Sequence, residues 1–370
     1  MDVAVVGAGP IGVEMALAAR EAGHTVVVFE AGEVGQHLDQ WGHVTLFTPW
    51  SMNTTARGRR ILGDAAFLSD TTVCPTGAEL RERYLKPLAA TLDVRRGHRV
   101  VAISRPWKPK GAELGRASRT DTPFHLLLDG PEGEQEHVAD VVVDCTGVFG
   151  DPAPLGPGGA PVPGERNNPV VRHGPVDVSD LAGRRVLLVG AGASATTVLR
   201  DLLALRPAAD IHWITPDATV PGFVSPPDDP LPQRRELVDV AVRALETVTH
   251  HPGAAITRLR GGDLTLDSGE ALSVDAVIAC TGFRPDHSLS RELQVHVCWG
   301  SEGPMKLAAA LLSAKGDGPA DCLAGGAEGP DLLKSPEPRF FVLGNKSYGR
   351  RSDFLLGVGF RQVDEVLELL

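Results

Sequence analysis

The sequence predicts an α/β fold with two nucleotide-binding domains, the second inserted into the first. Two repeated features predict it. A glycine-rich loop follows a short apolar strand twice, at residues 7–12 and 190–195, and a Cys-Thr-Gly tripeptide ends an apolar strand twice, at 145–147 and 280–282. A strand, a glycine loop and a helix in this order form the phosphate cradle of a Rossmann-like βαβ unit.

The positions of these repeats divide the chain into three segments. Residues 1–150 are predicted to begin the first domain, 151–285 to form the inserted domain, and 286–370 to complete the first. A stretch rich in proline and glycine leads out of the first segment at 152–163. A second such stretch, at about 313–338, is predicted to be a mobile loop, because it lacks an apolar period.

The first glycine loop has every residue that a dinucleotide cradle needs. Val3–Val6 is predicted as a strand, apolar residues at helical spacing follow the loop, and Thr25–Phe29 is predicted as the next strand. The first glycine permits the tight turn, the second lets the backbone approach a pyrophosphate, and the third lets helix and strand pack closely. A carboxylate at the end of the second strand can accept from ribose hydroxyls. The predicted cofactor-binding residues are Gly7, Gly9, Pro10, Ile11, Gly12 and Glu30.

The second glycine loop is a variant of the first. Arg185–Val189 is predicted as the strand before it, and Ile211–Thr215 as the strand after its helix. The third small residue of the motif is alanine in place of glycine. The predicted cofactor-binding residues are Gly190, Gly192, Ala193, Ser194 and Ala195.

Two further segments complete the layout. His137–Gly147 is predicted as an apolar strand ending in Cys-Thr-Gly, and Phe340–Asn345 as a strand followed by a glycine-containing turn and an amphipathic closing helix. Together with the two cradles, this layout resembles the superfamily of flavoproteins with two dinucleotide-binding domains. That superfamily includes flavin-containing monooxygenases and thioredoxin-reductase-like enzymes, and the resemblance covers nearly all 370 residues.

The resemblance implies FAD in the first domain and NAD(P)H in the inserted one. In these flavoproteins a Gly-Asp near the C-terminus holds the ribityl and phosphate region of the flavin, and the last helix points its N-terminus at the isoalloxazine. Asn345 stands here where the aspartate is usual, so this contact carries no charge. The residues implied to bind FAD are Cys145, Thr146, Gly147, Gly344, Asn345 and Phe360.

The sequence after the second cradle favours NADPH and leaves NADH as an alternative. A site for NADPH usually has an arginine just after the second strand, and a site for NADH has an acidic residue there. The stretch Thr215-Pro216-Asp217 fits neither case cleanly. Ala195 resembles the variant that prefers NADPH, and Arg234 and Arg235 are candidate partners for a 2′-phosphate.

Hydride transfer from nicotinamide to flavin must be followed by transfer to an acceptor. A redox-active disulfide normally needs a Cys-x-x-Cys pair, which the five cysteines do not form. Relatives that use a single cysteine place it where Ile11 stands. We therefore expect a monooxygenase that N- or S-oxygenates a small molecule through a peroxyflavin. The alternatives are a thioredoxin-reductase-like enzyme acting on a small thiol or disulfide, and a non-catalytic flavin-binding redox sensor.

Three residues are candidates for catalysis. Asn53 lies in the aromatic segment 41–58, which resembles the stretch of flavin-containing monooxygenases that lies over the flavin and supplies an asparagine. Lys346 and Tyr348 belong to a basic turn, 345–354, in an otherwise acidic chain. This turn is predicted to bind an anionic substrate carboxylate or the FAD phosphates.

Composition limits the partners. A net charge of −11 disfavours nucleic-acid binding. No apolar run reaches the roughly 18 residues of a membrane helix, and the first strand begins too early for a targeting peptide. We expect a cytoplasmic protein with a small-molecule substrate, no membrane partner and no metal, with a homodimer as an option.

Overall fold

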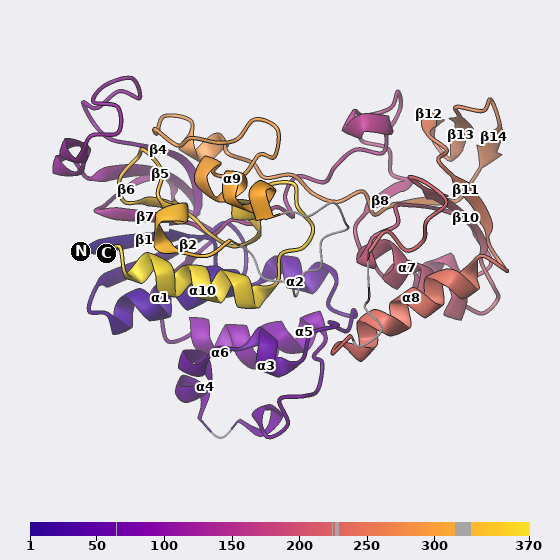
Figure 1. Cartoon of the computed structure of the whole chain (residues 1–370), viewed down its shortest axis with the longest axis horizontal. Coiled ribbons are helices and arrows are strands. Elements are labelled where there is room, and N and C mark those ends of the chain that lie inside the picture. Colours follow the sequence, from indigo (N-terminus) through magenta and orange to yellow (C-terminus); the bar gives the residue numbers. More distant parts are fainter. Residues whose placement is uncertain (64, 224, 226–228, 315–326) are drawn as a thin grey trace.

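The computed structural model describes residues 1–63, 65–223, 225, 229–314 and 327–370. Two lobes lie side by side, and each is built on a five-stranded parallel sheet (Figure 1). The first lobe contains both chain ends, and the middle of the chain forms the second. The structure is therefore the predicted α/β fold, with one nucleotide-binding domain inserted into the other.

The sheet of the first lobe has the strand order β16-β7-β1-β2-β3. Val3 and Val5 of β1 face the helices α1 and α10, whereas Ala4 and Val6 face an antiparallel sheet, β4-β5-β6. Because both faces are covered, the central strands are apolar on both sides. The elements are β1 (Asp2–Val6), α1 (Pro10–Glu21), β2 (Thr25–Glu30), β3 (Val94–Arg96), β4 (Arg99–Ser104), β5 (Phe124–Gly130), β6 (Gly133–Ala139), β7 (Val141–Asp144), β16 (Phe340–Val342) and α10 (Leu356–Leu367).

The sheet of the second lobe has the order β11-β10-β9-β15-β8. Val186 and Leu188 of β9 pack with the helices α7 and α8, and Leu187 and Val189 pack with the antiparallel sheet β12-β13-β14. The elements are β8 (Val171–His173), β9 (Arg185–Val189), α7 (Ala193–Ala204), β10 (Asp210–Thr215), α8 (Pro232–Ala244), β11 (Thr249–Pro252), β12 (Ile256–Arg260), β13 (Asp263–Leu266), β14 (Ala271–Ser273) and β15 (Ala276–Ala279).

The two lobes repeat one plan. In each, the strand before the cradle is central. Counted from that strand, a three-stranded antiparallel sheet follows the third parallel strand, β3 or β11, and precedes the fourth, β7 or β15. The fifth strand of each sheet comes from a different side of the other four in the sequence. In the first lobe it is β16, near the C-terminus, and in the second it is β8, which precedes the cradle.

The remaining helices belong mainly to the first lobe, where α3, α4, α5 and α6 lie beneath the sheet and α9 lies above α10 in the view of Figure 1. The segment from Gly77 to Ala89 is one continuous helix with a π-helical turn at its centre, Leu80–Leu85. The other helices are α2 (Gln36–Gln40), α3 (Trp50–Asn53), α4 (Ala56–Leu62), α5 (Gly77–Glu79), α6 (Lys86–Ala89) and α9 (Met305–Ala314), with short 3₁₀ helices at Pro330–Leu333 and Gly344–Tyr348 among others.

Two expectations about loops and strands need correction. The stretch 137–147 is not one strand, because His137–Ala139 ends the antiparallel β6 and only Val141–Asp144 joins the parallel sheet. Of the loop predicted to be mobile, residues 315–326 lie outside the described residues, and Ser313 and Ala314 end α9. Residues 327–338 pack on the first lobe, where Leu333 and Glu337 are buried.

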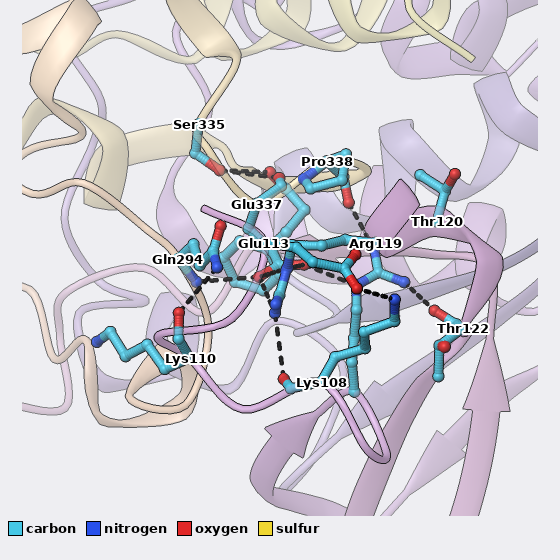
Figure 2. Close-up of polar contacts among 12 residues, drawn as sticks. Lys108, Lys110, Glu113, Arg119, Thr120, Thr122, Gln294, Ser335, Glu337 and Pro338 are labelled. Atoms are coloured by element: carbon cyan, nitrogen blue, oxygen red, sulfur yellow. Dashed lines mark hydrogen bonds and ion pairs between the residues drawn. The ribbon is translucent and has the colours of Figure 1, made fainter. Parts of the chain in front are cut away.

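A fully buried ionic cluster fixes the chain just before β16 (Figure 2). Glu337 accepts from Arg105 Nε at 2.6 Å, from Arg119 Nη2 at 2.8 Å and from the backbone N–H of Gln294 at 3.0 Å. Arg105 also donates to the carbonyl of Pro338. The cluster therefore joins the loop after β4 to the segment that leads the chain into β16, and so sets where that strand enters the sheet.

Candidate functional site

The two glycine cradles have the same backbone geometry. Gly9 and Gly192 are the N-cap residues of α1 and α7, and both have φ −76° and ψ 179°. Neither helix has a side-chain cap or an acidic residue in its first turn. The N–H groups at the N-termini of α1 and α7 are therefore available to an anion, as phosphate binding requires.

The first glycine of each cradle touches the Cys-Thr-Gly segment of its own lobe. Gly7 has φ +102° and Gly190 φ +121°, a region that L side chains rarely adopt. A Cβ would lie 2.7 Å from the carbonyl oxygen of Cys145 at Gly7, and 2.4 Å from that of Cys280 at Gly190. Only glycine fits at these positions. The repeated tripeptide thus forms one wall of each cradle.

The third position differs between the cradles. A Cβ on Gly12 would lie 1.9 Å from the carbonyl oxygen of Gly7, whereas Ala195 carries its Cβ in a fully buried position. Helix α1 therefore approaches its loop more closely than a side chain would allow. The glycine cradles fit a dinucleotide phosphate at both sites, because Cβ atoms on Gly9 and Gly192 would meet nothing within 4 Å.

The strand ends beside the cradles carry different groups. At the end of β2, Glu30 accepts from the N–H of Ala8 at 2.8 Å and from that of Gly32 at 2.9 Å, so its carboxylate lies at the rim of the first cradle. At the end of β10, the buried Thr215 hydroxyl donates to the carbonyl of Asp217 and lies 2.8 Å from His250 Nε2.

The two arginines expected to contact a 2′-phosphate have other partners. Arg234 Nε donates to Asp229 at 2.5 Å in a buried pair, and Arg235 donates to the carbonyl of Asp229. Both side chains are thus directed at the turn before α8. A contact of Arg234 or Arg235 with the 2′-phosphate of NADPH therefore stays a prediction.

A buried glutamine, which sequence reasoning missed, holds the C-terminal segment that is predicted to bind FAD. Gln362 of α10 accepts from the N–H of Gly344 at 2.9 Å and donates to Ser347 Oγ at 2.9 Å. Ser347 in turn donates to the carbonyl of Gly344. Gln362 therefore ties the loop after β16 to α10. Its place on a buried helix face is the one signal that the sequence offered. The predicted FAD residues Asn345 and Phe360 are half-buried in the same region.

The basic turn 345–354 does not form the free anion site that we expected. Lys346 Nζ donates to Asp144 Oδ2 at 2.6 Å, and both side chains are about 1% exposed. Arg350 pairs with Glu302 and Arg351 with Asp353. Each cation of the turn is neutralised by a carboxylate, so the turn offers no unpaired cluster of positive charge. Two of the carboxylates, Asp144 and Glu302, are distant in the sequence, so the charges of the turn gave no sign of them, whereas Asp353 lies within the turn itself.

Tyr348 is also buried. Its ring packs edge-on against Phe354, with centroids 5.3 Å apart, and its hydroxyl finds no hydrogen-bond partner within the described part of the chain. Burial raises the pKa of this phenol. A neutral, buried hydroxyl of this kind can donate a proton in a hydrogen bond but does not act as a ready base.

Asn53 holds its own turn. Its Nδ2 donates to the carbonyls of Thr48 at 2.7 Å and Pro49 at 3.0 Å, and its Oδ1 accepts from Thr48 Oγ1 at 3.0 Å. The side chain is 2% exposed. Both amide hydrogens are therefore engaged, and a free donor toward a flavin is not seen. The short helix α3 nonetheless lies against the first turn of α10, since a Cβ on Gly357 would be 3.9 Å from the carbonyl of Met52.

The four described cysteines are free thiols in different surroundings. Burial raises the pKa of Cys145 well above its usual range, raises that of Cys280 to about 12 and raises that of Cys74. The pKa of Cys298 is lowered, first by the Ser301 hydroxyl and then by the backbone N–H groups of Ser301 and Gly300. Since only thiolates are nucleophilic, Cys145 is a packing residue of the cradle wall.

This difference predicts the order of alkylation. With iodoacetamide at mildly alkaline pH, Cys298 should be modified before Cys74, Cys145 and Cys280, because it has the largest thiolate fraction of the four. Peptide mass spectrometry over a time course measures the rates. Cys298→Ser is the control that removes the fast phase. Modification of Cys145 at the rate of Cys298 would contradict the assignment.

Comparisons with known proteins agree with this architecture. The family model described as pyridine nucleotide-disulphide oxidoreductase matches residues 1–303. No curated protein matches the chain. The fold is similar to that of a bacillithiol disulfide reductase from Bacillus cereus, at 19% identity and TM-score 0.74, over 100% of this chain and 98% of that one.

Two other solved structures share the fold. One is a flavin-containing monooxygenase from Stenotrophomonas maltophilia, at 20% identity and TM-score 0.61, over 100% of this chain and 97% of that one. The other is a thioredoxin reductase from T. acidophilum, at 15% identity and TM-score 0.64, over 99% of this chain and 98% of that one. Within the described residues, no helix is long and apolar enough to cross a bilayer, and no three His, Cys, Asp or Glu side chains gather as metal ligands.

Proposed function

Because this chain belongs to the pyridine nucleotide-disulphide oxidoreductase family, and is an FAD-dependent NAD(P)H oxidoreductase, we propose that it is a monooxygenase that N- or S-oxygenates a small molecule. When bound, FAD would supply the redox chemistry that links hydride from the nicotinamide to the reduction of oxygen. The chain's own residues bind the two nucleotides, orient them and keep water out.

The exposure of the cradles supports a division of labour between them. In the first cradle Ile11 is buried and Gly9 is half-buried, whereas the equivalent residues of the second, Ser194 and Gly192, are exposed. A ligand in the first cradle is therefore enclosed, and one in the second can exchange with solvent. This arrangement suits FAD as a resident group and NAD(P)H as a co-substrate.

The residues around the first cradle support the proposal that oxygen is the electron acceptor. Among the described cysteines, Cys145 is the one at this cradle, and its pKa is raised well above its usual range by burial. The position that holds a reactive cysteine in some relatives is Ile11, whose side chain packs near Gly344 and Gly359. The lack of a reactive thiol at this cradle favours oxygen chemistry over disulfide reduction.

The decisive experiment separates reduction from reoxidation. Anaerobic protein loaded with FAD should be bleached by NADPH, with NADH tested in parallel, and mixing with oxygen should restore the yellow colour. Oxygen consumption should rise when candidate amines and thioethers are added. NADPH oxidation that proceeds anaerobically and needs a disulfide would contradict the monooxygenase. Flavin reduction without any turnover would identify a sensor.

Coupling of NADPH oxidation to oxygenation should depend on Asn53. Asn53→Ala removes all contacts of the amide with Thr48 and Pro49, so the turn that lies against the start of α10 is expected to loosen. The variant enzyme should then release more hydrogen peroxide per NADPH oxidised. Thr48→Val is the matched control, because it removes one hydroxyl partner and leaves both carbonyl contacts. A peroxide yield unchanged in Asn53→Ala would reject this role.

A second candidate function is supported by Cys298, a partly exposed thiol with a lowered pKa. The peptide around it lies against the loop after β16, since Arg350 N–H donates to the carbonyl of Ser301 at 2.9 Å. If the enzyme reduces a small disulfide, Cys298→Ser should abolish the reaction. If it is a monooxygenase, the same variant should keep its oxygen consumption.

A further inference from the structure

The buried pair of Lys346 and Asp144 joins the two chain segments expected to hold the flavin. Lys346 Nζ donates to Asp144 Oδ2 at 2.6 Å and to Thr146 Oγ1 at 3.0 Å, across about 200 residues of sequence. Asp144 Oδ1 accepts from the N–H and the hydroxyl of Thr146, at 3.1 and 2.7 Å. Every polar atom of the Asp144 carboxylate is therefore paired within this network.

The position of the pair in the sheet places it at the site and not merely in the core. Asp144 is the last residue of β7, and its Cα partners are Val6 of β1 and Val342 of β16. It directly precedes Cys145–Gly147, the wall of the first cradle, and Lys346 follows Gly344 by two residues and Asn345 by one. Parallel strands end at the edge of the sheet where nucleotides bind.

Stability alone does not explain a charged pair at this place. A buried ion pair gains little over a well-packed apolar pair, because desolvation of the two charges offsets their attraction. The chain also departs from the superfamily here. Asn345 stands where a carboxylate is usual, and a carboxylate is found instead at Asp144, held by the residue after Asn345.

We propose that Asp144 and Lys346 are positioning residues for the flavin: they fix Cys145–Gly147 and Gly344–Asn345 relative to each other and balance the charge beside the bound FAD. This inference rests on the proposed use of FAD and adds residues that set the affinity and the reduction potential of the flavin. The ammonium and the carboxylate cancel in the wild type, so removal of either one leaves a single buried charge near the cofactor.

Opposite changes in the flavin midpoint potential are the test. Asp144→Asn leaves the ammonium of Lys346 unbalanced and should move the potential of the FAD-loaded protein upward, because positive charge favours the more negative, reduced flavin. Lys346→Met leaves the carboxylate and should move it downward. Both variants should lower the melting temperature. Glu337→Gln is the matched control, a buried carboxylate of the same lobe whose loss should lower stability without moving the potential.

A double variant keeps the inference testable if a single variant does not fold. Asp144→Asn with Lys346→Met buries no charge, so it should fold, and it should bind FAD at least about tenfold more weakly in a fluorescence titration of the apoprotein, about 1.4 kcal/mol. Lys346→Arg should keep a potential near that of the wild type. Equal potentials in the wild type and both single variants, or a wild-type FAD affinity in the double variant, would overturn the inference alone. A wild-type chain that binds no FAD would overturn the proposed function with it.

Discussion

Replacing Gly9 with alanine is expected to weaken FAD binding without unfolding the protein. The backbone of Gly9, φ −76° and ψ 179°, is accessible to any residue, and an added Cβ meets no protein atom within 4 Å. Alanine is a poorer N-cap, which costs about 1 kcal/mol or less. The same Cβ would occupy the space through which the backbone approaches a pyrophosphate, so FAD should bind at least about tenfold more weakly, about 1.4 kcal/mol.

Gly192→Ala is the matched control, because its backbone angles and its open surroundings are the same. This variant should purify yellow with a full complement of FAD and should need about tenfold more NAD(P)H for half-maximal flavin reduction. The ratio of flavin to protein absorbance after gel filtration measures the first effect, and stopped-flow reduction measures the second. A Gly9→Ala protein that retains one FAD per chain would contradict the assignment of the first cradle.

Replacing Glu337 with glutamine is expected to cost more stability than any surface change. Among the described residues, Glu337 is the carboxylate that pairs with the buried guanidinium groups of Arg105 and Arg119, and all three side chains are 0% exposed. Breaking a buried pair from one side typically costs about 3–5 kcal/mol, because a charge is left uncompensated. Glutamine keeps the shape and part of the hydrogen bonding, so the lower end of that range is expected.

Chemical denaturation with urea gives the measurement. The control is Glu328→Gln, which removes the carboxylate of an exposed pair with Arg361, and should change the free energy of unfolding by less than about 1 kcal/mol. Glu337 lies just before β16. In the Glu337→Gln protein, FAD should therefore be released at a lower urea concentration than the one at which the second lobe unfolds. A Glu337→Gln protein as stable as the Glu328→Gln control would show that the cluster is energetically neutral.

The cradles could be predicted from the sequence because their requirements are local. Gly7 and Gly190 need a positive φ, and Gly12 permits a close approach of helix and loop, so each position shows in the order of strand, glycines and helix. The repeated Cys-Thr-Gly was equally readable, since it follows a short apolar strand in both lobes. These local features predicted the α/β fold of two Rossmann-like lobes without reference to any side-chain contact.

The polar contacts could not be predicted in the same way. The charges of Lys346 and Arg350 looked like an anion site, because a sequence shows charges without their partners. Asp144 and Glu302 approach them only when β16 has been placed beside β7. The prediction of a mobile loop was wrong for residues 327–338 for the same reason. Its glycines and prolines suggest a loop, and the burial of Glu337 depends on two arginines more than 200 residues earlier.

The different sources of the fifth strand have a consequence for synthesis on the ribosome. All five parallel strands of the second lobe lie between Val171 and Ala279, so this lobe has its complete sheet well before translation ends. The first lobe emerges earlier but lacks β16 until residue 342 has left the ribosome, and until then β7 is an open sheet edge. The half of the protein made first is therefore finished last, and a chain truncated before β16 would present that unpaired edge to its neighbours.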